Sequence, residues 1–267
     1  MFLREKNLID QIPIILKIFF FTFGVLIGSF LNVLIYRLPR DYNIVFPRSN
    51  CPNCNKLISW YENIPMISFI RLGGRCSGCG ESISYLYPAI EFLTGLISLW
   101  LAPEYLSYDY LLNYFFLFTI MCIFLVHFIV DLKHKILPDS LNLLLFLLLL
   151  SHGWVFYKWT FWLSGLLIGF FVPFSVTWVF YLITKKIGMG GGDLKLYGCL
   201  GLYLGPIGII YNISLSCMLG AIIGGLWLLV AKKNKNEPIP FGPFIIVISI
   251  FQIYYSDFFC RYFPCGR

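Results

Sequence analysis

The sequence predicts an all-α membrane protein, with about eight transmembrane helices and one small zinc-ribbon-like loop on the cytoplasmic side. Three observations support this prediction: an apolar composition, a series of long apolar segments, and two closely spaced pairs of cysteines. Of the 267 residues, 59% are hydrophobic and 12% are charged, and the mean hydropathy is +0.80. A soluble domain carries roughly 25% charged residues, and one core could not bury this much apolar surface. The composition is therefore typical of a protein that is embedded in lipid.

Eight apolar segments are candidates for crossing the bilayer, whose hydrocarbon core requires a helix of about 20 residues. They cover residues 12–36, 86–102, 111–130, 140–157, 161–184, 194–207, 209–231 and 239–258. The segment 12–36 is longer than the apolar part of a signal peptide, and no small-residue cleavage pattern follows it, so we expect a retained span. The number of spans depends on how the second and sixth segments are counted, because they are short or glycine-rich.

Basic residues are distributed unevenly among the loops between these segments. The loops 37–85 and 131–139, and the segments after the fifth and seventh spans, carry Lys and Arg, whereas the loops between them carry few. Cytoplasmic loops of membrane proteins collect basic residues, so we expect Asp131, Asp193 and the loop 37–85 to share the cytoplasmic face. The formal net charge of +7 has the same origin, and we expect no nucleic-acid partner.

The loop 37–85 contains two Cys-x-x-Cys pairs, formed by Cys51, Cys54, Cys76 and Cys79. Two such pairs at this separation are typical of a four-thiolate zinc site, because each places two sulfurs on one edge of a tetrahedron. Four protein ligands close the coordination sphere, so we expect a structural Zn²⁺ that a loop of this size needs for folding. Two disulfides, or redox-active pairs without metal, are the alternative, which a reducing cytoplasm disfavours.

Other residues in and beyond this loop have simpler interpretations. Glycines 73, 74 and 78 are expected to supply the tight turns beside the cysteines. Three further cysteines lie in apolar segments and are expected to be packing residues: Cys122, Cys199 and Cys217. Cys260 and Cys265 fall on the predicted outer side, where a disulfide is an open alternative.

Two aspartates stand at the predicted cytoplasmic ends of apolar segments. Asp131 ends the third span, and Asp193 follows the glycines Gly190, Gly191 and Gly192. An ionisable residue at such a boundary is a candidate for a functional site, and two carboxylates that share one proton can hydrolyse a peptide bond. The ionised member draws a proton from water while the protonated member polarises the carbonyl. The glycines would let the backbone approach a substrate closely.

Simpler interpretations of these acidic residues stay open at this point. An aspartate at the end of a span is often only a solvated cap, and Asp139, followed by Ser140, is predicted to be the N-cap of the fourth span. His127, one helical turn before Asp131, either faces that carboxylate or packs at a helix interface. Because 62 positions separate Asp131 from Asp193, their contact is a hypothesis about the fold that spacing does not establish.

In this order, the motifs of the chain resemble those of the type IV prepilin peptidases, also called leader peptidase/N-methyltransferases. The resemblance covers most of the chain. Besides the cysteines and the aspartates, it rests on GSFLNV at 28–33, YRLP at 36–39, SWYENIP at 59–65, GRC at 74–76, YPAIE at 87–91 and PFGPF at 240–244. The stretch RLGGR at 71–75 has a glycine where the family often has a larger residue, a departure that affects nothing catalytic.

The resemblance implies an enzyme of the bacterial inner membrane that cleaves the basic leader of prepilins and pseudopilins after a glycine, at the cytoplasmic face. The family's catalytic aspartates correspond to Asp131 and Asp193. The resemblance also implies N-methylation of the new N-terminus with S-adenosylmethionine as methyl donor. This second activity is associated with the N-terminal region, so we expect residues 1–105 to form the methyltransferase part and residues 106–267 a six-helix peptidase domain. The site of the methyl donor stays unassigned.

Two other classes of function compete with this one. In a membrane transporter, Asp131 and Asp193 would be proton or cation sites, but no acidic residue is predicted near the middle of the membrane. In a membrane-anchored zinc scaffold, the aspartates would only cap helices. The expected partners of the enzyme are prepilin or pseudopilin substrates and membrane lipid.

Overall fold

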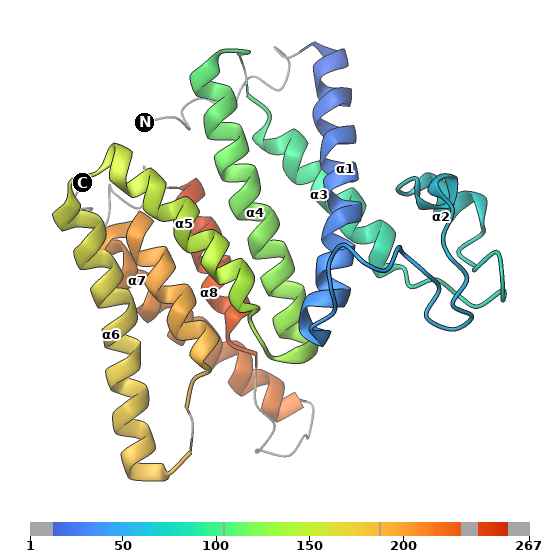
Figure 1. The fold of residues 1–267 in the computed structure, drawn as a ribbon. Helices are drawn as coiled ribbons and strands as arrows, with labels where there is room; N and C mark the ends of the chain where they lie inside the picture. The colour runs from blue at the N-terminus through green and yellow to red at the C-terminus, as the bar shows by residue number, and fades with distance from the viewer. Residues whose placement is uncertain (1–12, 104, 187, 231–239, 256–267) are drawn as a thin grey trace. The chain divides into compact units, whose positions relative to one another are not determined.

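The computed structural model describes residues 13–103, 105–186, 188–230 and 240–255, which are mostly helical (Figure 1). The elements are α1 Ile14–Arg37, η1 Leu38–Arg40, η2 Trp60–Asn63, α2 Ile67–Arg71, α3 Leu86–Leu101, α4 Tyr108–His134, α5 Asp139–Phe156, α6 Trp159–Thr184, α7 Gly191–Val230 and α8 Gly242–Tyr254, where η marks a 3-10 helix. In the same ranges the β-structure is limited to two isolated bridges, Asn50 with Leu57 and Arg75 with Ser82. The all-α prediction is confirmed.

Among the described residues, five helices are long and apolar enough to cross a membrane. They are Ile14–Arg40, Tyr108–His134, Asp139–Phe156, Trp159–Thr184 and Gly191–Leu226. The apolar helices α3 and α8 are shorter, with 16 and 13 residues. At 1.5 Å per residue α3 extends over roughly 24 Å, less than the hydrocarbon core of about 30 Å. Every predicted span overlaps a helix, while the count of eight stays a prediction. The end of the last predicted span, Cys260 and Cys265 lie outside the described residues.

The long helix α7 is a hairpin of two helices. At Gly205 the backbone leaves the helical region, with φ of 70° and ψ of −177°, and Pro206 follows. The hydroxyls of Tyr197 and Ser216 form a hydrogen bond of 2.6 Å, although a straight helix would separate these positions by roughly 28 Å. The break agrees with the sequence prediction of separate spans over 194–207 and 209–231. It turns α7 back so that the helix after the break packs against its own beginning.

The chain divides into two compact units, one running to Cys122 and the other starting at Ile123. In the first unit, α1 and α3 pack closely through small residues. A Cβ atom added at Gly24 would lie 2.5 Å from Cβ of Ser98, and one at Gly28 would lie 2.8 Å from Cα of Glu91. In lipid the hydrophobic effect does not drive helices together, so they associate through close packing. Small residues allow this packing because they let the two backbones approach each other.

The second unit repeats this mode of packing between α6 and α7. A Cβ atom at Gly165 would lie 2.1 Å from the carbonyl oxygen of Gly201, so only glycine fits there. Helix α8 is joined to α7 by buried amides instead: Asn212 donates to Ser249 and to Gln252, at 3.0 and 2.7 Å. These bonds attach α8 to the part of α7 after Gly205, and that part bonds through Ser216 to Tyr197 in the part that carries Asp193.

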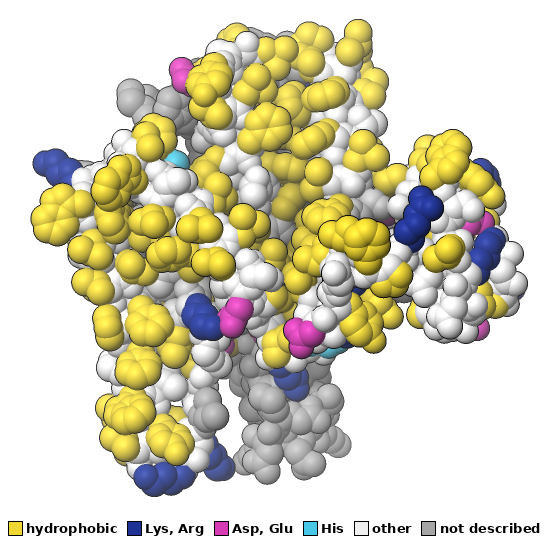
Figure 2. Space-filling view, in the orientation of Figure 1, with side chains coloured by type: hydrophobic (Ala, Val, Ile, Leu, Met, Phe, Trp, Pro, Cys, Tyr) yellow, Lys and Arg dark blue, Asp and Glu magenta, His cyan; other side chains and the backbone are white. Residues whose placement is uncertain are grey.

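Hydrophobic side chains cover the helices on the face shown in Figure 2, and Lys and Arg are sparse among them. Many large apolar residues of α5 and α6 are exposed, including Leu143, Leu147, Phe171 and Val179. A water-soluble protein rarely exposes apolar surface on this scale. The surface therefore supports the assignment of these helices as membrane-spanning.

Candidate functional site

Asp131 lies in the last turn of α4, in the part of this helix that belongs to the second unit, and its carboxylate is bonded within that unit. The residue is 4% exposed, and the backbone N–H of Gly242 donates to its Oδ2 at 2.9 Å. Gly242 is the first residue of α8, so its N–H is one of those that a helix leaves free at its N-terminus. A Cβ atom at this position would lie 2.8 Å from Oδ2 of Asp131, which explains why a glycine stands there.

Asp193 lies in the first turn of α7 and is also buried, at 9% exposure. The backbone of Gly190 bonds to its carboxylate. Gly190 and Gly191 are exposed, and a Cβ atom added at Gly191 would have no neighbour within 4 Å. The backbone beside Asp193 is therefore open to approach, although none of the three glycines from 190 to 192 has a positive φ.

Leu137 lies close to a glycine beside each of the two aspartates. A Cβ atom added at Gly192 would lie 2.9 Å from Cβ of Leu137, and one added at Gly242 would lie 3.3 Å from Cδ2 of the same leucine. Asp131 is also the charged group that acts electrostatically on Asp193. The second unit thus brings together two carboxylates that are 62 positions apart in the chain.

The structure contradicts the sequence interpretation of Asp139 and decides between the two alternatives for His127. Asp139 is not an N-cap: the cap position of α5 is Pro138, without a side-chain bond, and Asp139 accepts a bond of 2.7 Å from Lys195. His127 is fully buried one turn before Asp131 and interacts with the amide of Asn142 on α5, as expected for packing at a helix interface. Sequence reasoning did not identify Gly242 as a partner of Asp131, although its motif PFGPF was noted.

The four cysteines of the loop form a second candidate site, within the first unit. Their sulfur atoms all lie within 4.8 Å of one another, and the pairs Cys51–Cys79 and Cys54–Cys76 are each separated by 3.9 Å. A tetrahedron with zinc–sulfur bonds of about 2.3 Å has sulfur–sulfur edges of about 3.8 Å. The four thiols therefore fit a Zn²⁺ ion at their centre.

The two Cys-x-x-Cys pairs have the same backbone turn. In the first, the N–H of Cys51 donates to the carbonyl of Lys56 and the N–H of Asn55 to that of Cys51, at 3.0 and 2.9 Å. In the second, Cys76 donates to Glu81 and Gly80 to Cys76, at 2.8 and 2.9 Å. Asn55 and Gly80, which follow the second cysteine of each pair, have positive φ.

The glycine prediction for this loop is therefore only partly correct. Gly73 and Gly74 do have positive φ, but they lie just after α2 and before the second turn. Gly78 has no positive φ; a Cβ atom there would lie 3.3 Å from Sγ of Cys54. Asn55 and Gly80 make the tight turns instead.

The thiols in this cluster differ in their readiness to ionise. Backbone N–H groups of Cys79 and Gly78 bond to the sulfur of Cys76 and lower the pKa of that thiol to about 6. At Cys79 a backbone bond from Glu81 favours the thiolate, but lost hydration and the sulfurs of Cys54 and Cys76 outweigh it, and the pKa rises to about 11. A bound divalent cation would stabilise all four sulfurs as thiolates, because the thiolate is the form of cysteine that binds metal.

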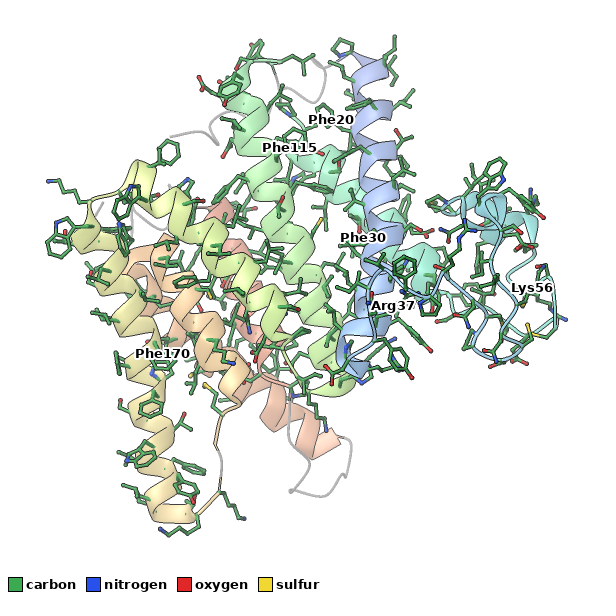
Figure 3. The ribbon with its side chains drawn as sticks, in the orientation of Figure 1. Phe20, Phe30, Arg37, Lys56, Phe115 and Phe170 are labelled. Carbon is green, nitrogen blue, oxygen red and sulfur yellow. The ribbon has the colours of Figure 1, made fainter. Side chains whose placement is uncertain are left out.

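Glu62 connects the two cysteine turns. Its Oε1 accepts a hydrogen bond of 2.5 Å from Ser77 and forms an ion pair of 3.2 Å with Lys56, which also donates to Ser77 at 2.7 Å. Figure 3 labels Lys56 in this loop. The Ser77 hydroxyl, the backbone N–H of Ser59 and Lys56 lower the pKa of Glu62 to about 2. The sequence indicated Glu62 only as part of the motif SWYENIP.

Comparison with known proteins places both sites in known domains. The chain matches the Bacterial Peptidase A24 N-terminal domain over residues 22–105 and the Type IV leader peptidase family over residues 116–225. A prepilin leader peptidase/N-methyltransferase of Stutzerimonas stutzeri is 36% identical over 259 residues, which are 88% of this chain and 89% of that protein. Proteins of the same name from Pseudomonas aeruginosa and Aeromonas hydrophila are each 35% identical, covering 88% and 91% of this chain and 88% and 92% of theirs. No solved structure matches the chain significantly.

Proposed function

Because the chain belongs to the type IV leader peptidase family, we propose that it cleaves the leader peptide of prepilins or pseudopilins and N-methylates the new N-terminal residue. The similarity to leader peptidase/N-methyltransferases, over 88% to 91% of this chain, supports both activities. The observation that carries the peptidase activity is the presence of two buried carboxylates in one unit, from helices far apart in sequence. No feature of the described residues favours the transporter.

Asp131 and Asp193 would act as one unit that holds a single proton between two carboxylates. The ionised carboxylate takes a proton from a water molecule, whose oxygen attacks the scissile carbonyl carbon. The protonated carboxyl group gives its proton to the carbonyl oxygen. Collapse of the tetrahedral intermediate breaks the C–N bond, and the leaving amine takes up a proton. The exposed backbone of Gly190 and Gly191, followed by Gly192, would bind the extended segment of the substrate beside the pair.

The location of cleavage follows from the position of the aspartates on their helices. Asp131 is three residues from the C-terminal end of α4, and Asp193 is the third residue of α7. Both would lie at a membrane boundary, and the basic loops beside them support the cytoplasmic side; the membrane would be the bacterial inner membrane. A prepilin, with a basic leader followed by an apolar helix, would present its cleavage point at this level.

Methylation is proposed for the N-terminal region, residues 1–105, with the peptidase in residues 106–267. S-adenosylmethionine supplies the methyl group when it is bound. None of the described residues is assigned to its binding.

Zn²⁺ would be held by Cys51, Cys54, Cys76 and Cys79. With four protein ligands the ion has no open position for substrate, so its proposed contribution is to the folding of the loop.

Cleavage of a synthetic prepilin in detergent or liposomes, followed by mass spectrometry, tests the proposed mechanism. Asp131→Asn and Asp193→Asn should each reduce the rate by about 1,000-fold or more, within the range of positioned proton transfer, while the proteins stay folded. Asp139→Asn is the matched control, because its exposed carboxylate lies on α5 and pairs with Lys195; we expect near-normal cleavage. Normal cleavage by either Asp131→Asn or Asp193→Asn would exclude the proposed pair.

The same assay distinguishes the second activity and the alternative functions. Addition of S-adenosylmethionine should give a product heavier by one methyl group. If the wild-type protein cleaves no prepilin but supports ion flux in vesicles, the transporter interpretation replaces the peptidase. If neither activity is found and both substitutions leave cellular function intact, the scaffold interpretation replaces it.

A further inference from the structure

The first unit contains a hollow, beside the end of α1, that the proposed reaction does not use. It has a volume of about 330 Å³ and is formed by α1, the segment 44–49 and residues between Ile58 and Asn63. This volume is at the lower end of the range for small-molecule sites, roughly 300–1,000 Å³. Figure 3 shows Phe30 and Arg37 on α1, with Arg37 next to the chain that follows the helix.

Arg37 contributes a buried positive charge to this hollow. The residue is 8% exposed, and its guanidinium donates to the backbone carbonyls of Asn43, Ile44 and Pro47 at 2.9, 2.8 and 2.6 Å. No carboxylate of the described residues bonds to it. Buried charges are normally paired, and neutral carbonyls leave the net charge of Arg37 in place.

A second arginine makes the hollow more positive. Arg48 lines the same hollow, is exposed, and has no hydrogen bond or ion pair with the described part of the chain. None of the lining residues is acidic. Two guanidiniums around one cavity, without a carboxylate, favour an anionic ligand, and a phosphate group matches their fork of N–H donors.

Besides the two arginines, Ser49 and Asn63, the hollow is lined by apolar side chains, some of which lie on the membrane-spanning helix α1. Phe30 and Val33 precede Arg37 on α1 and line it, as do Val45 and Trp60, and Trp60 is 77% exposed. Helix α1 has 24 residues and extends over about 36 Å, more than the hydrocarbon core of about 30 Å. Arg37 at its end therefore lies at the level of the lipid headgroups, with Phe30 toward the acyl chains.

We propose that this hollow binds an anionic phospholipid. Its headgroup phosphate would bond to Arg37 and Arg48, and an acyl chain would run along Phe30 and Val33. Trp60 suits the boundary between them, because tryptophan concentrates at membrane interfaces. The site fits S-adenosylmethionine less well, since two guanidiniums would repel its sulfonium and ammonium groups.

The test compares two arginine variants of the full-length protein in detergent. Arg48→Gln removes a charge inside the hollow without breaking a hydrogen bond. Arg40→Gln removes the same charge three residues after Arg37 but outside the hollow, where Arg40 donates to the carbonyl of Tyr36 and stacks on its ring. Lipid binding is measured by native mass spectrometry during titration with phosphatidylglycerol or phosphatidylcholine, and inorganic phosphate and S-adenosylmethionine are then added as competitors.

The wild-type protein should retain phosphatidylglycerol in preference to zwitterionic phosphatidylcholine. Arg48→Gln should weaken phosphatidylglycerol binding about fivefold, as expected for one basic residue near an anionic lipid, and Arg40→Gln by less than twofold. Equal losses in the two variants would show diffuse attraction and overturn the site. Competition by inorganic phosphate at equal concentration would show a site for free anions, and competition by S-adenosylmethionine a site for the methyl donor; either would overturn the lipid assignment. Prepilin cleavage is not needed for any of these outcomes.

Discussion

The cysteine site and the aspartate site are held together by bonds of very different range. In the cysteine loop, each turn closes through backbone bonds between residues four or five positions apart, such as Cys51 with Asn55 and with Lys56. At the aspartate site, the bond from Gly242 to Asp131 spans 111 positions. The first site is therefore specified by local sequence, whereas the second exists only after the helices have packed.

The two sites also differ in their contact with solvent. Cys54 and Cys79 are exposed, while both aspartates are buried. A loop with little buried apolar surface depends on its metal for stability. Two carboxylates surrounded by apolar helices depend instead on the fit of neighbouring residues. Each site should therefore fail for a different reason.

Among changes that keep both aspartates and all four cysteines, the largest effect is expected from a methyl group placed at the aspartate site. In Gly242→Ala, the new Cβ would lie 2.8 Å from Oδ2 of Asp131, so the carboxylate or α8 must shift. A displacement near 1 Å costs about 100-fold in rate, and we expect a loss of prepilin cleavage of this size in a protein that still binds zinc. Gly225→Ala is the control, because a Cβ there would have no neighbour within 4 Å. Normal cleavage by Gly242→Ala would show that the bond from Gly242 does not position Asp131.

Removal of one zinc ligand should damage the cysteine site and leave the aspartate site intact. Cys51→Ser leaves three thiols, and we expect zinc content, measured by mass spectrometry of the metal, to fall by most of one equivalent. The loop should become sensitive to protease, since its turns lose the ion that joins them. Some cleavage of prepilin should persist. Cys217→Ser, which changes an exposed cysteine outside the loop, should retain zinc. Complete loss of cleavage in folded Cys51→Ser would contradict the separation of the two sites.

The difference in range explains which features could be predicted from the sequence. Cys51, Cys54, Cys76 and Cys79 were identified as a metal site from spacing, because each pair of ligands is local and the structure brings them together. The apolar segments predicted the helices for a similar reason: hydrophobicity over about 20 residues is a local property. The break at Gly205 lies close to the predicted boundary between the spans 194–207 and 209–231.

Long-range contacts account for what the sequence could not provide. Nothing in the spacing places Leu137 between Gly192 and Gly242, and the approach of Asp131 to Asp193 follows from helix packing alone. Asp139 was predicted as a cap from its position before a span; its partner Lys195 lies 56 positions away. The role of Asn55 in the first cysteine turn was missed for a local reason, because glycine was expected to take the positive φ.

A smaller effect is expected from Glu62, which links the two cysteine turns. Glu62→Gln should speed zinc release to a chelator several-fold, since the bonds to Ser77 and Lys56 lose their charge. Glu81→Gln, an exposed acid of the same loop, is the control and should release zinc at the normal rate.

The pH dependence of this effect follows from the low pKa. The pKa of Glu62 falls from 4.5 to about 2 in the folded loop, so its ionised form stabilises the fold fully above pH 4.5 and loses this contribution only as pH falls toward 2. The ratio of release rates between Glu62→Gln and wild type should stay constant from about pH 6 to pH 8. A ratio that changes in this range would show that another group controls the linkage.

The smallest effect is expected from the ion pair between Lys195 and Asp139, which joins α7 to α5 near the aspartates. Their side chains are 51% and 72% exposed, and exposed ion pairs contribute at most about 1 kcal/mol. Lys195→Gln should therefore lower the melting temperature in detergent by no more than about 4 °C, and cleavage should change little. We expect the aspartate site to be held together by the packing of Leu137 on Gly192 and Gly242 and not by the ion pair. A large loss of both stability and cleavage in Lys195→Gln would mean that the aspartate site also relies on a surface contact.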